Sequence, residues 1–165
     1  MTAVADLDLR RVFIQAGEWR CAAEPTVITT VLGSCVAVCL WDADTRIGGM
    51  NHFMLPASPG HEGDGRYSDV AVAGLIEAMT RLGARRKRMT AKLFGGAGVL
   101  AAAGEAIGDL NIAEAVALLR QARVPVAVQR TGGRAGRLIR FHTGTGEVEV
   151  QRLGRTLSLI PGGRT

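Results

Sequence analysis

Apolar residues fall into short runs separated by glycine and polar clusters, and this pattern predicts β-strands over much of the chain. Residues 36–41 form a continuous apolar run of strand length, and residues 26–31 are β-branched throughout. The turn composition of residues 42–45 predicts a hairpin between the run at 36–41 and the next one. Strands are predicted at residues 11–15, 26–31, 36–41, 47–55, 92–94, 126–129, 138–142 and 147–151.

Two other segments have helical periodicity. The first starts at Ser68, a residue suited to an N-cap, and Gly83 ends it. The second starts at Asn111, which with Glu114 has the spacing of a capping box. The residues predicted to face the core are Val72, Leu75, Ile76, Met79 and Leu82 in the first helix, and Ala115, Val116, Leu118 and Leu119 in the second.

The order of these elements is strands, helix, strand, helix, strands, which favours an α+β fold. We expect a layered sandwich of mixed β-sheets with flanking helices. A chain of 165 residues suits one domain, so residues 1–165 are predicted to form a single unit with its core at about 11–153. Residues 1–10 and the tail at 159–165 are predicted to be frayed, and Cys21 to lie in a loop.

The composition is 47% hydrophobic and 21% charged, which is typical of a globular protein. No apolar run has membrane-spanning length, and the N-terminus has no signal-peptide core, so we expect a cytoplasmic protein without membrane insertion. Three cysteines, an odd number, agree with a reducing compartment. The net charge of +5 would suit an acidic partner, but the few aromatic residues are not interleaved with arginines, which argues against nucleic-acid binding.

The hairpin at residues 36–55 carries the candidate chemistry. If Asp42 and Ile47 face each other at its mouth, His52 faces Ala37, two residues beyond Cys35. Strand side chains alternate, so Cys35 and His52 then share a face as diagonal neighbours, with backbones roughly 7–8 Å apart. A bulge near the glycines would bring them closer, whereas a slip of one residue in the register would send them to opposite faces.

A cysteine beside a histidine is the minimal apparatus for thiol-based acyl chemistry. The thiolate is the nucleophile, the imidazole moves the proton, and the small-residue turn at Gly33 and Ser34 leaves backbone N–H groups for an oxyanion. The alternative is that both residues are ordinary core side chains. A zinc site is disfavoured because Cys35 and Cys39 would be roughly 13 Å apart along one strand. We predict neither a metal nor another cofactor.

The same stretch resembles the CheD family, the chemoreceptor glutamine deamidases of bacterial chemotaxis. The resemblance starts with TVLGSCV at residues 30–36 and NHFMLP at residues 51–56. It continues in order with KLFGGA at 92–97, TGG at 131–133 and Gly136–Arg137, and it covers about residues 13–152.

The resemblance implies a protein-glutamine deamidase that acts on the cytoplasmic part of methyl-accepting chemoreceptors. It also implies binding to a CheC-type phosphatase. The rival interpretation is a binding module that docks receptors or the phosphatase and does not need its cysteine. The expected site residues are Cys35 as nucleophile, His52 as acid and base, Thr29 as support for the imidazole, Gly33 and Ser34 at the oxyanion, and Asn51, Gly95 and Gly96 at the substrate cleft.

Overall fold

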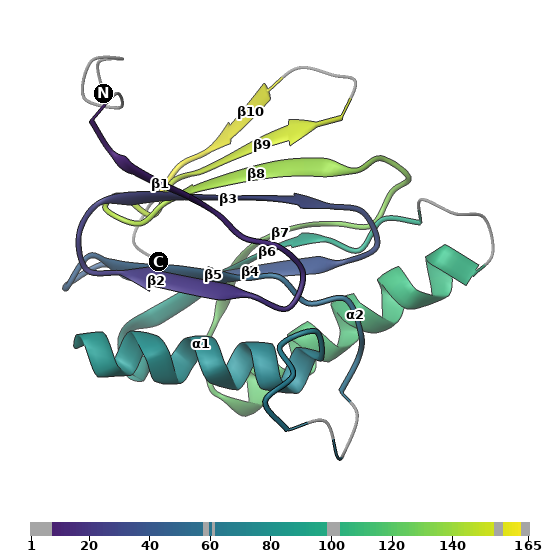
Figure 1. Ribbon diagram of the computed structural model, residues 1–165, viewed down its shortest axis with the longest axis horizontal. Helices are drawn as coiled ribbons and strands as arrows, with labels where there is room; N and C mark the ends of the chain where they lie inside the picture. Colours follow the sequence, from purple (N-terminus) through teal and green to yellow (C-terminus); the bar gives the residue numbers. More distant parts are fainter. Residues whose placement is uncertain (1–7, 58–59, 61, 99–102, 154–156, 163–165) are drawn as a thin grey trace.

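The structure is a computed structural model that describes residues 8–57, 60, 62–98, 103–153 and 157–162 (Figure 1). Its elements are β1 (Arg10–Phe13), β2 (Trp19–Ala22), β3 (Thr26–Leu32), β4 (Val36–Asp42), β5 (Ile47–Asn51), α1 (Ser68–Leu82), the 3-10 helix η1 (Arg86–Arg88), β6 (Met89–Gly95), α2 (Ala103–Gln121), β7 (Val126–Thr131), β8 (Arg137–His142), β9 (Val148–Arg152) and β10 (Leu157–Ile160).

The strands form two sheets that stack face to face. The first sheet has the order β1-β3-β8-β9-β10, and the second has the order β2-β5-β4-β6-β7. Each is mixed, because β1 pairs parallel to β3 and β6 pairs parallel to β7, while the other pairs are antiparallel. Both helices cover the face of the second sheet that points away from the first (Figure 1). The predicted layered α+β sandwich is confirmed.

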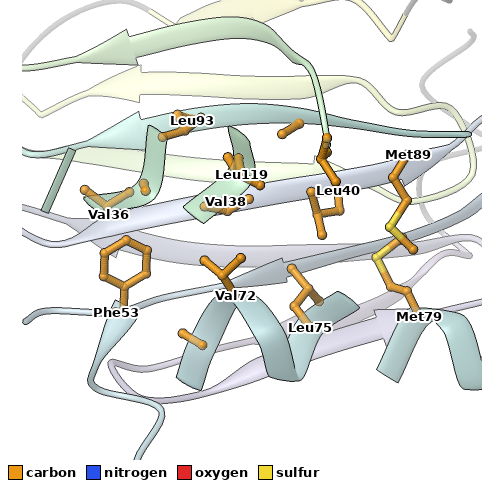
Figure 2. Packing of buried hydrophobic residues seen from close by; sticks show 14 of the residues in the cluster. Val36, Val38, Leu40, Phe53, Val72, Leu75, Met79, Met89, Leu93 and Leu119 are labelled. Atoms are coloured by element: carbon orange, nitrogen blue, oxygen red, sulfur yellow. The ribbon is translucent and has the colours of Figure 1, made fainter. Parts of the chain in front are cut away.

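The apolar core occupies two levels, as this layering requires. One cluster lies between the two sheets, and the other lies between the second sheet and the helices. In the helix-side cluster, Val72 and Leu75 of α1 point toward Val38 and Leu40 of β4 (Figure 2). Since β4 is buried on both faces, its sequence is a continuous apolar run instead of an alternating one. Each such fully buried side chain stabilises the fold by about 1.5–3 kcal/mol.

The strand registers bring several chain segments to the same end of the sandwich. The start of β4 pairs with the end of β6, since Val36 lies opposite Gly95, and Gly95 in turn lies opposite Thr131 at the end of β7. In the first sheet, Leu32 at the end of β3 lies opposite Arg137 at the start of β8. We call this end of the sandwich the β3–β4 end; it is on the right in Figure 1.

Several local predictions were wrong. Leu82 at the end of α1 was expected to face the core, but it is 45% exposed. Cys21 lies in β2, whose partner is β5, and not in a loop. The tail was expected to fray, but its residues 159–160 belong to β10, which pairs with β9. Ser68 was expected to be the N-cap of α1, but it is the first residue of the helix. The N-cap is Tyr67, which makes no side-chain capping bond. Asn111 lies inside α2, eight residues beyond its first residue, and so does not start the helix.

Gly83 does end α1, with a left-handed φ of 114°. The strands predicted at residues 138–142 and 147–151 are confirmed as β8 and β9, which pair antiparallel. Within the described parts of the chain, no helix combines the length and apolar character that a membrane span needs.

Candidate active site

The hairpin of β4 and β5 has the register that the sequence predicts. Asp42 lies opposite Ile47 and Cys39 opposite Met50. The same register continues in a bridge between Val36 and Phe53, whose backbones exchange two hydrogen bonds of 3.0 Å. Met50 is packed in the cluster between the sheets, and Cys35 packs against that cluster. Cys35 and His52 therefore lie on the face of the second sheet that points toward the first.

The turn that carries Cys35 is held through its carbonyl groups. The backbone N–H of Gly96 donates to Cys35 O at 2.8 Å, and that of Ala97 donates to Gly33 O at 2.9 Å. Gly95 is tightly fitted here: its φ is +106°, and a Cβ on this residue would collide with the Cys35 carbonyl oxygen. Gly95 at the end of β6 and Gly96 after it thus let their backbone approach the Cys35 turn closely.

Asn111 completes this support from the helical layer. Its Nδ2 donates to Ser34 O and to Met54 O, both at 3.1 Å, so one buried amide links the Cys35 turn to the segment that follows His52. The sequence signal was available, because Asn111 is four residues before the buried Ala115 on the apolar face of α2. A polar residue on that face suggests an internal hydrogen-bonding role.

The amide groups of this turn are left available. Among the described residues, the N–H groups of Ser34 and Cys35 donate a hydrogen bond to no other residue. Burial raises the pKa of the Cys35 thiol, and the residue's own backbone N–H opposes that rise. An N–H group beside the sulfur that donates to no other described residue is suited to hold an oxyanion that develops on a carbonyl under attack.

The orientation of the His52 ring follows from a chain of two hydrogen bonds. Thr30 Oγ1 donates its single hydrogen to Ile14 O at 2.8 Å. The same hydroxyl lies 2.7 Å from His52 Nδ1, so it must accept there, and Nδ1 must carry the proton. His52 Nε2 is then the unprotonated nitrogen, and it is buried without a hydrogen-bond partner among the described residues.

His52 is held neutral by its surroundings. Burial lowers its pKa to about 4, although the carboxylate of Glu18 acts in the opposite direction. The residue is 6% exposed. Its backbone is tied to the first loop, because Gly17 N–H donates to His52 O at 2.8 Å and His52 N–H donates to Glu18 O at 3.1 Å. A neutral imidazole with a free Nε2 can act as a proton acceptor for a nearby thiol.

The hydrogen bond expected of Thr29 is made by its neighbour. Thr30 lies on the inner face of β3 and contacts His52, whereas Thr29 lies on the outer face of the same strand, opposite Arg140. A shift of one residue along a strand reverses the direction of the side chain, so the sequence resemblance identified the strand but not the residue.

Asn51 is also placed differently from the expectation. Its side chain is fully buried, Oδ1 accepts from Val38 N–H at 2.9 Å, and Nδ2 donates to Ala71 O at 3.0 Å. These bonds join β5 to β4 and α1, so Asn51 acts as an internal connector and presents no surface to a cleft. Within the described residues, no cluster of three or more His, Cys, Asp or Glu side chains is arranged to hold a metal ion.

Comparison with known proteins identifies the family. The family model CheD, described as CheD chemotactic sensory transduction, matches residues 54–152. The chain belongs to the CheD family. It is 49% identical over 145 residues to the probable chemoreceptor glutamine deamidase CheD 1 of Anaeromyxobacter dehalogenans, covering 87% of this chain and 85% of that protein.

Two further CheD relatives extend the comparison. The probable chemoreceptor glutamine deamidase CheD of Rhodospirillum rubrum is 46% identical over 153 residues, covering 92% of this chain and 87% of that protein. The protein of the same name from Sulfurimonas denitrificans is 38% identical over 160 residues, covering 91% of this chain and 99% of the relative. The resemblance seen in the sequence motifs therefore extends over most of this member of the CheD family.

Proposed function

We propose that this CheD-family protein hydrolyses the side-chain amide of glutamines in chemoreceptors, with Cys35 as the nucleophile and His52 as the acid and base. The proposed substrate rests on the names of the relatives. The observation that carries the mechanism is the state of the His52 ring, whose Nδ1 proton is held by Thr30 while Nε2 remains free. The ring and Cys35 share one face of the second sheet.

In the resting protein, Cys35 is a neutral thiol and His52 is a neutral imidazole. Burial raises the pKa of the Cys35 thiol and lowers that of His52, so a preformed thiolate–imidazolium pair is disfavoured. No hydrogen bond joins Cys35 to His52 among the described residues. The proton therefore moves from sulfur to Nε2 as the substrate carboxamide arrives, by general base catalysis.

The chemical steps then follow in order. The Cys35 sulfur bonds to the carboxamide carbon, and the oxyanion is received by the free N–H groups of the turn. His52 Nε2 returns its proton to the departing nitrogen, the C–N bond breaks, and ammonia leaves a thioester on Cys35. A water molecule gives a proton to Nε2 and attacks the thioester carbon, which releases a glutamate side chain and the thiol. Throughout, Thr30 accepts from Nδ1 and keeps Nε2 directed at the reacting atoms.

Mass spectrometry of a purified chemoreceptor cytoplasmic fragment tests this proposal. Wild-type protein should convert glutamines to glutamates, and Cys35→Ser should abolish the conversion. Cys21→Ser is the matched control, because Cys21 is also a free, half-buried cysteine but lies in β2. If an authentic receptor stays unchanged with folded wild-type protein, catalysis is excluded, and a docking role toward receptors or a CheC-type phosphatase becomes the better explanation.

A further inference from the structure

A second polar feature lies at the β3–β4 end of the sandwich. It is a cavity of about 340 Å³ between β7 and the strands β8, β9 and β10. The side chains of Arg130, Arg137 and Arg152 line it, together with the apolar Val150 and Ile160. Thr131 and Gln129 add uncharged polar groups, and no described Asp or Glu lines the cavity. A concave surface with several guanidinium groups and no carboxylate favours an anionic ligand.

Two of these arginines, Arg137 and Arg152, converge on one point. Arg137 and Arg152 lie directly opposite each other on β8 and β9. A Cβ built on Gly133 would lie 3.8 Å from Arg137 Nη2 and 4.0 Å from Arg152 Nη2, so both guanidinium groups approach one point. Among the described residues, neither of them nor Arg130 forms an ion pair.

Arg137 is fixed in place by the backbone around it. Its Nη1 donates to Gly95 O at 2.9 Å and its Nη2 donates to Gly132 O at 2.6 Å. Burial lowers the pKa of Arg137, and the nearby charge of Arg152 lowers it further. Two like charges held together in a partly buried place repel each other and destabilise the folded protein. A bound anion would reduce this repulsion.

The cavity is close to the proposed nucleophile. Arg137 donates to Gly95 O, and the next residue, Gly96, donates to Cys35 O. Cys35 precedes β4, and β7 is two strands away in the same sheet, across β6. With about 4.8 Å between neighbouring strands, the arginine cavity begins roughly 10 Å from the Cys35 turn.

We infer that this arginine cavity is a subsite for carboxylate side chains of the protein substrate, and that it selects glutamines with an acidic residue nearby. The inference rests on the proposed function. At a rise of 1.5 Å per residue, roughly 10 Å corresponds to about seven residues of a helical substrate, or two turns. The preferred glutamine therefore has Asp or Glu about one to two helical turns away on the same helix face.

Binding of a chemoreceptor fragment to the Cys35→Ser variant tests the subsite without catalysis. In this background, the double variant Arg130→Gln/Arg152→Gln should bind the fragment about tenfold more weakly at low salt, and the difference should shrink as salt increases. Arg137 is left unchanged, because it also holds Gly95. The matched control is Arg86→Gln/Lys87→Gln, which removes the same charge from η1, at the opposite end of the sandwich, and should change binding less than twofold.

A substrate-side change makes the test specific. Replacing an Asp or Glu within two turns of a modified glutamine by Ala should weaken binding to the Cys35→Ser protein but not to its arginine double variant. Equal effects of the two double variants, or no effect of either, would overturn the subsite. Wild-type deamidation is measured in parallel: conversion that does not depend on the arginines leaves the proposed function standing, whereas arginine-dependent binding without conversion refutes only the deamidase.

Discussion

The two ends of β4 carry two turns with opposite hydrogen-bonding character. At the C-terminal end of β4, the carboxylate of Asp42 is fully buried. It accepts from Asp44 N–H at 3.1 Å, from Arg85 N–H at 2.9 Å and from the Arg88 guanidinium at 3.1 Å. Burial alone would raise the pKa of Asp42, but these donors lower it below its ordinary value. The backbone carbonyl of Asp42 is bonded as well, since it accepts from Arg46 N–H at 2.8 Å, so both the side chain and the backbone of Asp42 stabilise this turn.

At the N-terminal end of β4, the carbonyls of Gly33 and Cys35 accept hydrogen bonds, whereas the N–H groups of Ser34 and Cys35 donate to no other residue in the part of the chain that the structure describes. His52 likewise uses Nδ1 and leaves Nε2 free. A buried polar atom without a partner costs about 1–3 kcal/mol, so the molecule pays for this arrangement with stability. Of the two turns that flank β4, the one at Asp42 stabilises the fold, and the one at Cys35 has polar groups available to a substrate.

The largest expected effect is on stability, at the Asp42 end. Asp42→Ala leaves Arg85 N–H without its acceptor and Arg88 with only its 3.6 Å ion pair to Asp44, and it should lower the free energy of unfolding by about 3 kcal/mol. Urea denaturation measures the loss. Deamidation per folded molecule should not change, and a fall in that specific activity would show that the two ends are coupled.

Gly95→Ala should affect both stability and activity. The new Cβ would collide with the Cys35 carbonyl, and a non-glycine residue with φ of +106° is strained, so we expect a stability loss of about 2 kcal/mol and a displaced nucleophile. Gly132→Ala is the control, because its φ is also positive, at +78°, but nothing lies within 4 Å of its Cβ position. Similar activity losses in the two variants would contradict the close-approach role of Gly95.

The neutral state of His52 predicts a pH-dependent stability. Its folded pKa of about 4 is below the ordinary value of 6.5, so between these values the unfolded chain binds the extra proton. Stability is fully present above pH 6.5 and is lost as the pH falls toward 4, by about 1–2 kcal/mol between pH 7.5 and 5. His52→Gln should remove this component, and identical pH profiles for variant and wild type would show that His52 is not held neutral.

The smallest effect distinguishes the two adjacent threonines. Thr30→Val removes the acceptor for Nδ1–H and should reduce kcat about tenfold, equivalent to about 1.4 kcal/mol, with KM little changed. Thr29→Val, on the outer face of β3, should retain wild-type kcat. The pH profile of kcat should also shift in Thr30→Val alone, because the tautomer is no longer fixed. Equal kcat values for both variants would remove Thr30 from the site.

The sequence by itself determined most strand positions, the layered α+β class and the register that places Cys35 and His52 on one face. These features follow from local rules: apolar run length, turn composition at residues 42–45 and the two-residue period of a strand. The same rules could not find β2 and β10, which are short and stabilised by pairing with β5 and β9.

Only the tertiary structure decided which groups surround the cysteine and the histidine. Thr30 replaces Thr29 beside the ring, Asn111 serves the Cys35 turn from the interior of α2, and the arginines of three strands meet in one cavity. Each of these contacts joins residues far apart in the sequence, and a hydrogen bond depends on distances of a few tenths of an ångström. Periodicity along the chain carries no such information, because long-range contacts are set by how the layers pack.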